Sequence, residues 1–176
     1  MLHIATHGFY LGKSNPVSDH IMNLISLQNM NFEDNALNKS GLYLAGANTS
    51  LLNSAPVEKF NDGILTSLEV ASLNLRSVDL VVLSACETAL GEIAADGVFG
   101  LQRGFKKAGA NSILMSLWKV DDQATCFLMT EFYKHWIGGK NKHKALELAK
   151  NAVRSQTEKG WNNPKYWAAF ILLDSF

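Results

Sequence analysis

Two segments of the chain end in residues that can carry out nucleophilic catalysis. His7 and Gly8 follow the short apolar segment 2–6, and Cys86 follows the continuous apolar run 79–85. A free thiol has a pKa near ~8.5, so only a few per cent of it is thiolate at neutral pH. A nearby imidazole can accept the thiol proton and later deliver it to a leaving amine. The residue types therefore suffice for acyl transfer through a thioester.

This chemistry requires that the two segments be neighbouring strands of one parallel sheet. Functional groups collect at the carboxyl ends of such strands, where the imidazole of His7 and the thiol of Cys86 would emerge side by side. The N–H groups of Gly8 and Cys86 could then stabilise an oxyanion. Spacing alone leaves the commoner situation open, in which a buried structural cysteine and an unrelated histidine share a sheet.

The elements around these residues predict a three-layer α/β fold with a mostly parallel sheet. Residues 79–85 and 112–118 are apolar, β-branched runs typical of buried strands. Apolar residues between them recur at helical spacing, and Gly109 follows where a helix ends. Strand, helix and strand form a βαβ unit. The helical residues are Val98, Leu101, Phe105 and Ala108.

Further elements are expected on both sides of this unit. Short strands are predicted at residues 2–6 and 41–45, and the capping-box sequence at 66–69 predicts a helix over 67–72. Residues 13–39 form a loop or insertion. Downstream, we expect a helix capped by Asp121 or Asp122 and ended by Gly138 and Gly139. A second helix follows with Ala145, Leu148, Ala149 and Ala152 on one face, and a last strand spans 166–173, after Pro164.

Composition places the chain among soluble globular proteins. Its 176 residues suit one domain, and 47% of them are hydrophobic against 18% charged. Sixteen basic residues balance sixteen acidic ones, which argues against nucleic acid or an anionic membrane as the main partner. No apolar run could cross a bilayer and no signal peptide begins the chain, so a cytoplasmic location is expected, with both cysteines as free thiols.

The order of several motifs resembles the CHAT domain, a family of caspase-like cysteine peptidases related to separases and gingipains. The resemblance covers nearly the whole chain, and the histidine and cysteine motifs are specific together. The matching segments are HIATHG (3–8), DGILT (62–66), LVVLSACETALG (80–91), DGVFGLQRGF (96–105), AGA (108–110), SLWKVDD (116–122), AT (124–125) and, after Pro164, YWAAF (166–170).

The resemblance implies a caspase-like fold and a cysteine endopeptidase that needs no metal or cofactor. It assigns His7 as general base and acid, Cys86 as nucleophile, and Gly8 with Cys86 as donors of the oxyanion N–H groups. It also implies protein or peptide substrates and a regulatory partner built from tetratricopeptide-type helical repeats. The family has further strands before the histidine-bearing strand, so residues 1–176 are expected to form one CHAT-type domain that is incomplete at its N-terminus.

Two further residues are candidates for substrate binding. Trp118 follows the strand after the nucleophile's strand and could line a pocket there, as readily as it could pack in the core. Asp122, with Asp121, could give that pocket a preference for Lys or Arg, although helix N-capping is the more common role for one of these carboxylates. Glu87 and Thr88 follow the nucleophile and could contact substrate or form structural hydrogen bonds, whereas Asp62 is expected to fix a turn.

The remaining histidines and the second cysteine receive structural interpretations. His3 shares one strand face with His7 and is expected to pack against a neighbouring element. Cys126 is expected in the core of a helix. His20, His135 and His143 are interpreted as surface residues, and no cluster has zinc-ligand spacing.

One alternative belongs to a different functional class. A non-catalytic, caspase-like interaction module, either a pseudo-peptidase or a truncated fragment, would keep the fold and bind a partner along an exposed sheet edge. An α/β-hydrolase-type acyltransferase is disfavoured because Cys86 lacks the Gly-x-Ser/Cys-x-Gly turn and its histidine precedes it.

Overall fold

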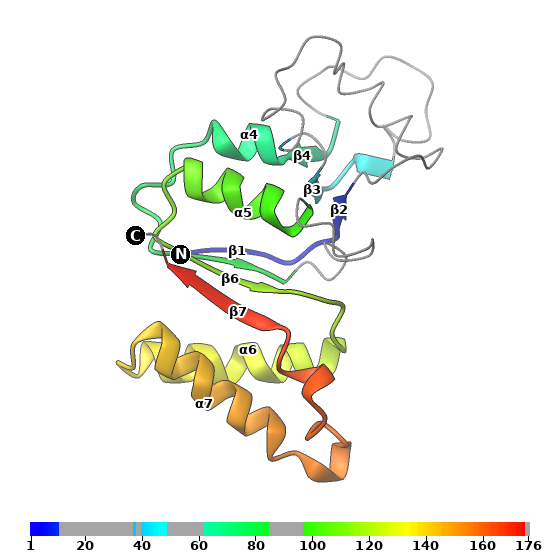
Figure 1. Ribbon diagram of the computed structural model, residues 1–176, viewed down its shortest axis with the longest axis vertical. Helices are drawn as coiled ribbons and strands as arrows, with labels where there is room; N and C mark the ends of the chain where they lie inside the picture. Colours follow the sequence, from blue (N-terminus) through cyan, green and yellow to red (C-terminus); the bar gives the residue numbers. More distant parts are fainter. Residues whose placement is uncertain (11–36, 38–39, 49–61, 85–96, 175–176) are drawn as a thin grey trace.

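The computed structural model describes residues 1–10, 37, 40–48, 62–84 and 97–174. These residues form a four-stranded sheet with helices on both faces and a separate three-stranded sheet (Figure 1). The α/β, three-layer fold class predicted from the sequence is therefore confirmed. The candidate residues Cys86, Glu87 and Thr88 lie outside the described residues, as does all of the predicted 13–39 loop except the buried Leu37.

The larger sheet has the strand order β1-β5-β6-β7. β1 pairs with β5 and β5 with β6 in parallel, whereas β6 and β7 are antiparallel. The sheet is thus mixed but mostly parallel, as expected. Its strands are β1 (Leu2–Ile4), β5 (Leu80–Leu83), β6 (Ser112–Ser116) and β7 (Phe170–Asp174).

The two central strands are buried on both faces. Every residue of β5 and of β6 is buried, which explains why both read as continuous apolar runs in the sequence. Alternate side chains enter opposite layers of the core, because successive residues of a strand point to opposite faces. Val82 and Leu114 belong to one apolar cluster, while Val81 and Ile113 belong to the other.

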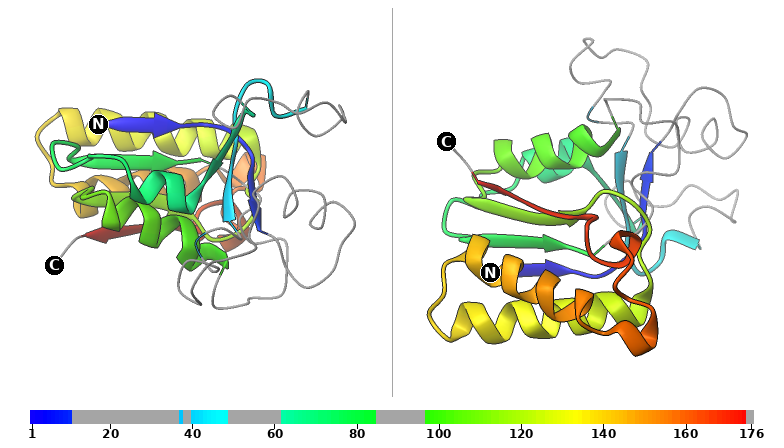
Figure 2. Two further views of the ribbon diagram at one scale, coloured as in Figure 1. Left: turned by 90° about the horizontal axis from the view of Figure 1, so that it is seen from above. Right: turned by 60° about the horizontal axis from the view of Figure 1, so that its bottom comes forward.

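Helices form the two outer layers. On one side of the sheet lie α4 (Ser67–Ala71) and α5 (Gly97–Lys107), which pack on each other. On the other side lie α6 (Asp122–Ile137) and α7 (Lys142–Arg154), which run side by side across the sheet (Figure 2). These helices supply the buried residues Leu101, Phe105, Leu128, Phe132, Ala145 and Ala149. The face predicted for α7 is only partly correct, because Leu148 and Ala152 are half-buried whereas Leu146 and Val153 are buried.

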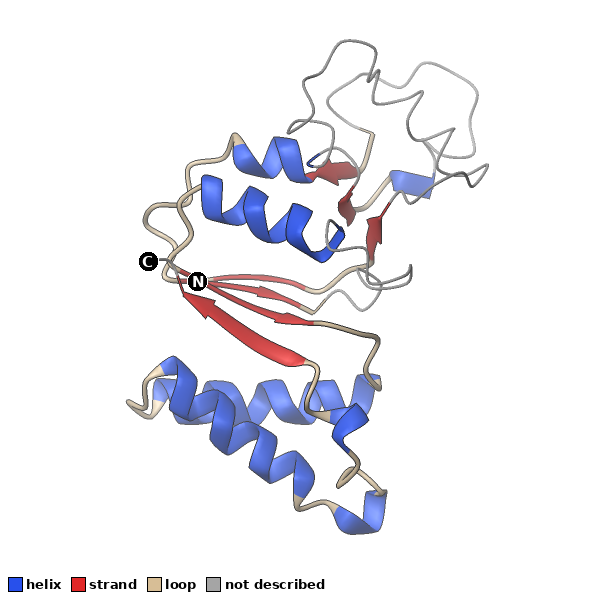
Figure 3. Cartoon of the chain, in the orientation of Figure 1, coloured by secondary structure: helices blue, strands red, loops and turns tan. Residues whose placement is uncertain are grey.

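The second sheet was not predicted as a unit. It consists of β2 (Gly8–Tyr10), β3 (Ser40–Tyr43) and β4 (Ile64–Thr66), paired antiparallel in the order β2-β3-β4 (Figure 3). The predicted strand at 41–45 belongs here rather than to the main sheet. Gly41 is required at the β2–β3 pairing, since a Cβ atom there would lie 2.6 Å from the Phe9 ring and 2.6 Å from the Leu65 carbonyl oxygen.

Local signals in the sequence correctly marked the helix ends. Thr66 and Glu69 form the predicted capping box at the start of α4. Asp121 is the N-cap of α6 and accepts a hydrogen bond from the Ala124 N–H at 2.9 Å. Gly109 follows α5 with φ +95°, a backbone conformation that glycine adopts without strain.

The last strand begins later than predicted. Two short 3₁₀ helices, η1 (Thr157–Lys159) and η2 (Pro164–Tyr166), precede it, and β7 starts only at Phe170. Asn163 caps η2 through its side chain, and Pro164 supplies a backbone angle suited to the first helical position. These two residues outweigh the strand preference of the aromatic and aliphatic residues at 166–169.

None of the helices described here is both long enough and apolar enough to span a lipid bilayer.

Candidate active site

The strands that lead to the two candidate catalytic residues are direct neighbours. β1 and β5 pair in parallel with Leu2 opposite Val81 and Ile4 opposite Leu83, and the Ser84 N–H donates to the Ile4 carbonyl at 3.1 Å. This confirms the adjacency on which the catalytic prediction depended. In the sequence, His7 follows Ile4 by three residues and Cys86 follows Leu83 by three residues.

His7 lies in the short connection between the two sheets. The chain bends at Thr6, so the alternation of a strand that would place His3 and His7 on one face ends before His7. The Thr6 hydroxyl donates to the Tyr43 carbonyl, and the Tyr43 N–H donates to the His7 carbonyl at 2.9 Å. The backbone at His7 is therefore anchored to β3, while its side chain is exposed.

Gly8 is the first residue of β2 and is buried. It pairs with Leu42 of β3, whose side chain is fully buried in the core. The next residue, Phe9, places its ring 4.9 Å from that of Tyr43. Gly8 thus occupies a fixed position where the antiparallel sheet meets the end of the main sheet.

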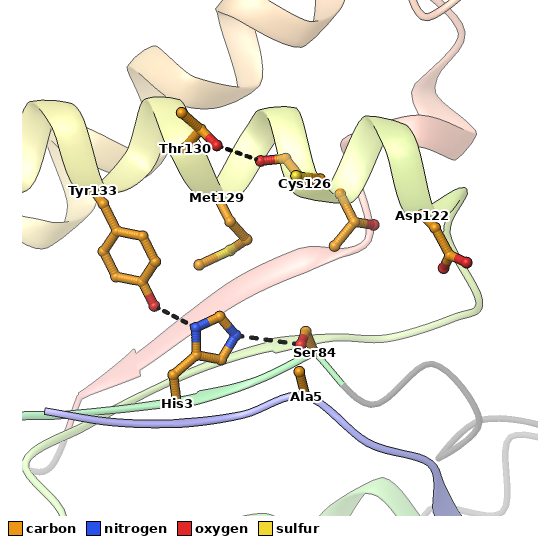
Figure 4. A pocket seen from close by; sticks show the side chains of 9 residues that line it. His3, Ala5, Ser84, Asp122, Cys126, Met129, Thr130 and Tyr133 are labelled. Carbon is orange, nitrogen blue, oxygen red and sulfur yellow. Dashed lines mark hydrogen bonds between the residues drawn. The ribbon is translucent and has the colours of Figure 1, made fainter.

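A cavity of about 380 Å³ lies between the carboxyl ends of β1 and β5 and the first three turns of α6. Its floor contains His3, Ala5 and Ser84, and its roof contains helix residues that include Asp122, Cys126 and Tyr133 (Figure 4). The cavity is open and mostly apolar, and its polar lining residues come both from the strand ends, as His3 and Ser84, and from α6.

His3 forms hydrogen bonds through both of its ring nitrogens. Nδ1 lies 2.9 Å from the Tyr133 hydroxyl, and Nε2 lies 3.3 Å from the Ser84 hydroxyl. Partial burial lowers the pKa of the His3 imidazole, so the ring is neutral at pH 7. Burial also raises the pKa of Tyr133 to about 12, which keeps its hydroxyl protonated. The expectation that His3 packs against a neighbouring element is confirmed, because its ring bonds to Tyr133 of α6 and also to Ser84 after β5.

The expectation that Cys126 lies in the core is wrong. Ala124, Leu128 and Phe132 face the core at helical spacing, and Cys126, two residues before Leu128, lies on a different side of α6. Its side chain is exposed and contributes to the cavity wall. Cys126 is a free thiol in the structure, as predicted.

The two candidate substrate-binding residues occupy different surroundings. Asp122 is exposed in the first turn of α6 and lines the cavity. Because Asp121 provides the N-cap, Asp122 is not needed for that role. Trp118 follows β6 with a side chain that is 38% exposed, and its indole N–H donates to the Lys165 carbonyl at 3.1 Å.

The remaining predicted polar residues have structural partners. Asp62 accepts a hydrogen bond from the Ile64 N–H at 2.8 Å, which confirms the expected turn. His135 lies 3.6 Å from Glu131 one turn earlier, and His143 lies 2.7 Å from Asp174. Within the described ranges, no three His, Cys, Asp or Glu side chains converge as a metal-ligand set.

Sequence reasoning missed the grouping of Ser84 and Tyr133 with His3. One signal was present, because Asp122, Cys126, Met129 and Tyr133 recur at helical spacing and therefore share a face of α6. All four residues line the cavity. The sequence does not show that this face of α6 packs over the end of β1.

Comparison with known proteins gives two findings. The family model described as "CHAT domain" matches residues 1–175. Tetratricopeptide repeat protein 28 of Mus musculus and tetratricopeptide repeat protein 28 of Homo sapiens are each 37% identical to this chain over 112 residues. The alignment covers 64% of this chain but 4% of each relative, so the chain spans only a small part of their length.

Proposed function

Since this chain belongs to the CHAT domain family, which is related to the caspase-like cysteine peptidases, we propose that it is a cysteine endopeptidase domain. Cys86 is the nucleophile and His7 the general base and acid in this proposal. The substrate is a protein or peptide, and the reaction is hydrolysis of a peptide bond.

The observation that carries the proposal is the parallel pairing of β1 with β5. Ile4 and Leu83 are partners across this pairing, and His7 and Cys86 each follow three residues later. Equal spacing from a shared register point favours an imidazole and a thiol that emerge at one sheet edge. The anchoring of the His7 backbone to Tyr43 supports a defined position for the imidazole.

The chemistry then follows from the two side chains. His7 accepts the thiol proton, and the Cys86 sulfur attacks the substrate carbonyl carbon to form a tetrahedral oxyanion. The backbone N–H groups of Gly8 and Cys86 stabilise this oxyanion. The C–N bond breaks, the leaving amine takes the proton from His7, and a thioester remains. Water, deprotonated by His7, hydrolyses the thioester and restores the thiol.

Asp122 is proposed to bind a basic substrate side chain. Its carboxylate is exposed at the rim of the cavity beside the end of β5, and it is not engaged in capping α6. Trp118 is proposed as an aromatic wall for the same substrate segment, held in place by its bond to Lys165. Asp122→Asn should reduce cleavage of peptides with Lys or Arg before the cut more than cleavage of peptides with an apolar residue there.

The relatives suggest the kind of protein that would regulate this activity. Both carry the name tetratricopeptide repeat protein 28. A helical-repeat segment of the tetratricopeptide type is therefore the proposed regulatory partner, whether it is supplied by the same polypeptide or by another.

The test is labelling with a peptide that carries a thiol-reactive ketone, in a Cys126→Ala background. That background is needed because Cys126 is exposed and the chain has only two cysteines. We expect labelling in Cys126→Ala and its loss in Cys86→Ala. His7→Gln should slow labelling at pH 7 more than at pH 9, where the thiol ionises without help.

Cleavage of a peptide library by the wild-type chain supplies the second readout. In variants that carry one substitution each, labelling that survives Cys86→Ala but disappears in Cys126→Ala would contradict the assignment of the nucleophile. A protein that labels at Cys86 without any dependence on His7, and that cleaves nothing, would favour the non-catalytic interaction module.

A further inference from the structure

Three side chains form a hydrogen-bonded group that connects the ends of β1 and β5 to α6, the helix that packs over them. His3 comes from β1, Ser84 directly follows β5, and Tyr133 comes from α6. The imidazole bridges the other two, with Nε2 3.3 Å from the Ser84 oxygen and Nδ1 2.9 Å from the Tyr133 oxygen (Figure 4). The His3 and Tyr133 rings also contact each other, with centroids 5.8 Å apart.

The position of this bridge follows from the register of the sheet. His3 pairs with Val82, and Ser84 lies two residues further along the sequence, directly after β5 and on the same face. Such diagonal neighbours are within reach of a long side chain. The bridge therefore spans the two strands at their carboxyl ends, four residues before His7 and two residues before Cys86.

The backbone alone gives β1 limited support. β1 has three residues and lies at the edge of the described sheet, where β5 is its hydrogen-bonded neighbour. Immediately after it, the chain bends at Thr6 and enters the second sheet. On its C-terminal side, the segment that carries His7 is held by the hydrogen bond from Tyr43. On its N-terminal side, its position depends on the contacts that hold β1 in place.

Both hydrogen bonds can exist at once when the imidazole is neutral. A neutral ring has one N–H donor and one acceptor nitrogen, and hydroxyl groups can serve either. If the Tyr133 hydroxyl donates to Nδ1, then Nε2–H donates to Ser84. In the other tautomer, Ser84 donates to Nε2 and Nδ1–H donates to Tyr133. Either arrangement occupies both nitrogens, so His3 is not itself available as a base.

We propose that the Tyr133–His3–Ser84 chain is a positioning device that fixes the ends of β1 and β5 relative to each other and to α6. Through these two hydrogen bonds, the three residues set the separation between the His7 imidazole and the Cys86 thiol. The effect on the reactivity of Cys86 rests on the proposed function, whereas the effect on the positions of the strand ends and of His7 does not.

Variants that remove one hydroxyl each test the proposal. Ser84→Ala and Tyr133→Phe delete one bond of the chain with little change in volume, and Ser84→Thr keeps the hydroxyl. Ser155→Ala is the matched control, since it removes an exposed serine hydroxyl that donates to the Ala152 carbonyl at the C-terminal end of α7 and takes no part in the bonds of His3. All are made in the Cys126→Ala background, with the rate of Cys86 labelling measured from pH 5 to 10.

We expect Ser84→Ala and Tyr133→Phe to slow labelling at pH 7 by about tenfold, because small displacements of reacting groups have large effects on rate. The midpoint of the pH profile should move upward toward that of an ordinary thiol, near ~8.5. Ser84→Thr should restore both quantities, and Ser155→Ala should change neither. A profile with an unchanged midpoint in Ser84→Ala and Tyr133→Phe would overturn the effect on the reactivity of Cys86.

A second measurement separates this proposal from the function. The ring resonances of His7, labelled with ¹³C and assigned with His7→Gln, report its surroundings whether or not the protein is an enzyme. We expect these resonances to move in Ser84→Ala and Tyr133→Phe and to stay unchanged in Ser155→Ala. If they do not move in either hydroxyl variant, the positioning role is wrong. If they move in a protein whose Cys86 does not label, the positioning role stands and the peptidase function fails.

Discussion

The carboxylate of Asp174, at the end of β7, accepts a hydrogen bond from the Ser112 hydroxyl at the start of β6, with a distance of 2.7 Å. Its second oxygen lies 2.7 Å from Nε2 of His143. Lys142 donates to the same Ser112 hydroxyl at 3.0 Å and to Asp79 at 2.6 Å. This group of polar side chains joins the start of α7 to β6, to β7 and to the residue before β5, at the sheet end opposite the candidate active site.

The hydrogen bond from Ser112, followed by that from His143, lowers the pKa of Asp174. A carboxyl whose pKa is lower in the folded state stabilises the protein above its unfolded pKa, near ~3.9, and this stabilisation is lost as the pH falls through the folded value. We expect Asp174→Asn to be less stable than wild type at pH 6, with a difference that shrinks below about pH 4. Urea unfolding at several pH values measures this difference.

Ser112→Ala is the companion variant for this measurement. Ser112→Ala removes the hydrogen bond that contributes most to the lowered pKa of Asp174. In a Ser112→Ala background, Asp174→Asn should therefore lower the free energy of unfolding by less than it does in the wild type. A difference between wild type and Asp174→Asn that stays constant from pH 6 to pH 3 would show that the carboxylate is not stabilised in the fold.

The capping box at the start of α4 gives a prediction about stability. The Thr66 hydroxyl accepts from the Glu69 N–H at 3.2 Å, and the Glu69 carboxylate accepts from the Thr66 N–H at 2.7 Å. Thr66→Ala should lower the free energy of unfolding by about 1 kcal/mol. Ser72→Ala, at the exposed end of the same helix, should stay within about 0.5 kcal/mol of wild type. Equal effects of the two substitutions in urea unfolding would contradict the role of the cap.

Features governed by local sequence were predictable. The Thr66–Glu69 box, the Asp121 cap and the Gly109 helix end each depend on residues within a few positions of one another. The buried strands β5 and β6 were also predictable, because burial on both faces requires an unbroken apolar run. From these elements the three-layer arrangement followed, whereas the adjacency of β1 and β5 was a condition of the catalytic prediction that the pairing of the two strands satisfies.

Features governed by distant pairing were not predictable in the same way. The β2-β3-β4 sheet joins residues that are more than twenty positions apart, and each strand is too short to have a distinct pattern. The exposure of Cys126 depends on which side of α6 faces the sheet, and its aliphatic and aromatic neighbours concealed this. The partners of His3 come from Ser84 and from Tyr133, 130 residues away along the chain.

The crossing of Phe9 over Gly41 predicts the cost of adding one methyl group. The Cβ of Gly41→Ala would lie 2.6 Å from the Phe9 ring and 2.6 Å from the Leu65 carbonyl oxygen. Overpacking of this kind costs about 1–3 kcal/mol. Phe9→Leu replaces the ring with a smaller side chain and so removes one of these two clashes, whereas the clash with the Leu65 backbone remains. Gly41→Ala should therefore lower the free energy of unfolding by less in a Phe9→Leu background than in the wild type. A double-mutant cycle in urea measures the coupling, and strict additivity would mean that the two residues do not constrain each other.

α6 offers a matched pair of substitutions that tests which of its faces is in the core. Leu128 is completely buried among the residues that α6, α7 and the sheet contribute, whereas Ile137, at the end of the helix, is 83% exposed. Both substitutions to alanine remove aliphatic carbons and favour the helical conformation. Leu128→Ala should lower the free energy of unfolding by about 2–5 kcal/mol, because it removes apolar contacts and leaves a cavity. Ile137→Ala should change it by less than about 0.5 kcal/mol. Urea unfolding of both variants measures these values, and a loss at Ile137 comparable to that at Leu128 would mean that the end of α6 is covered in solution by another chain.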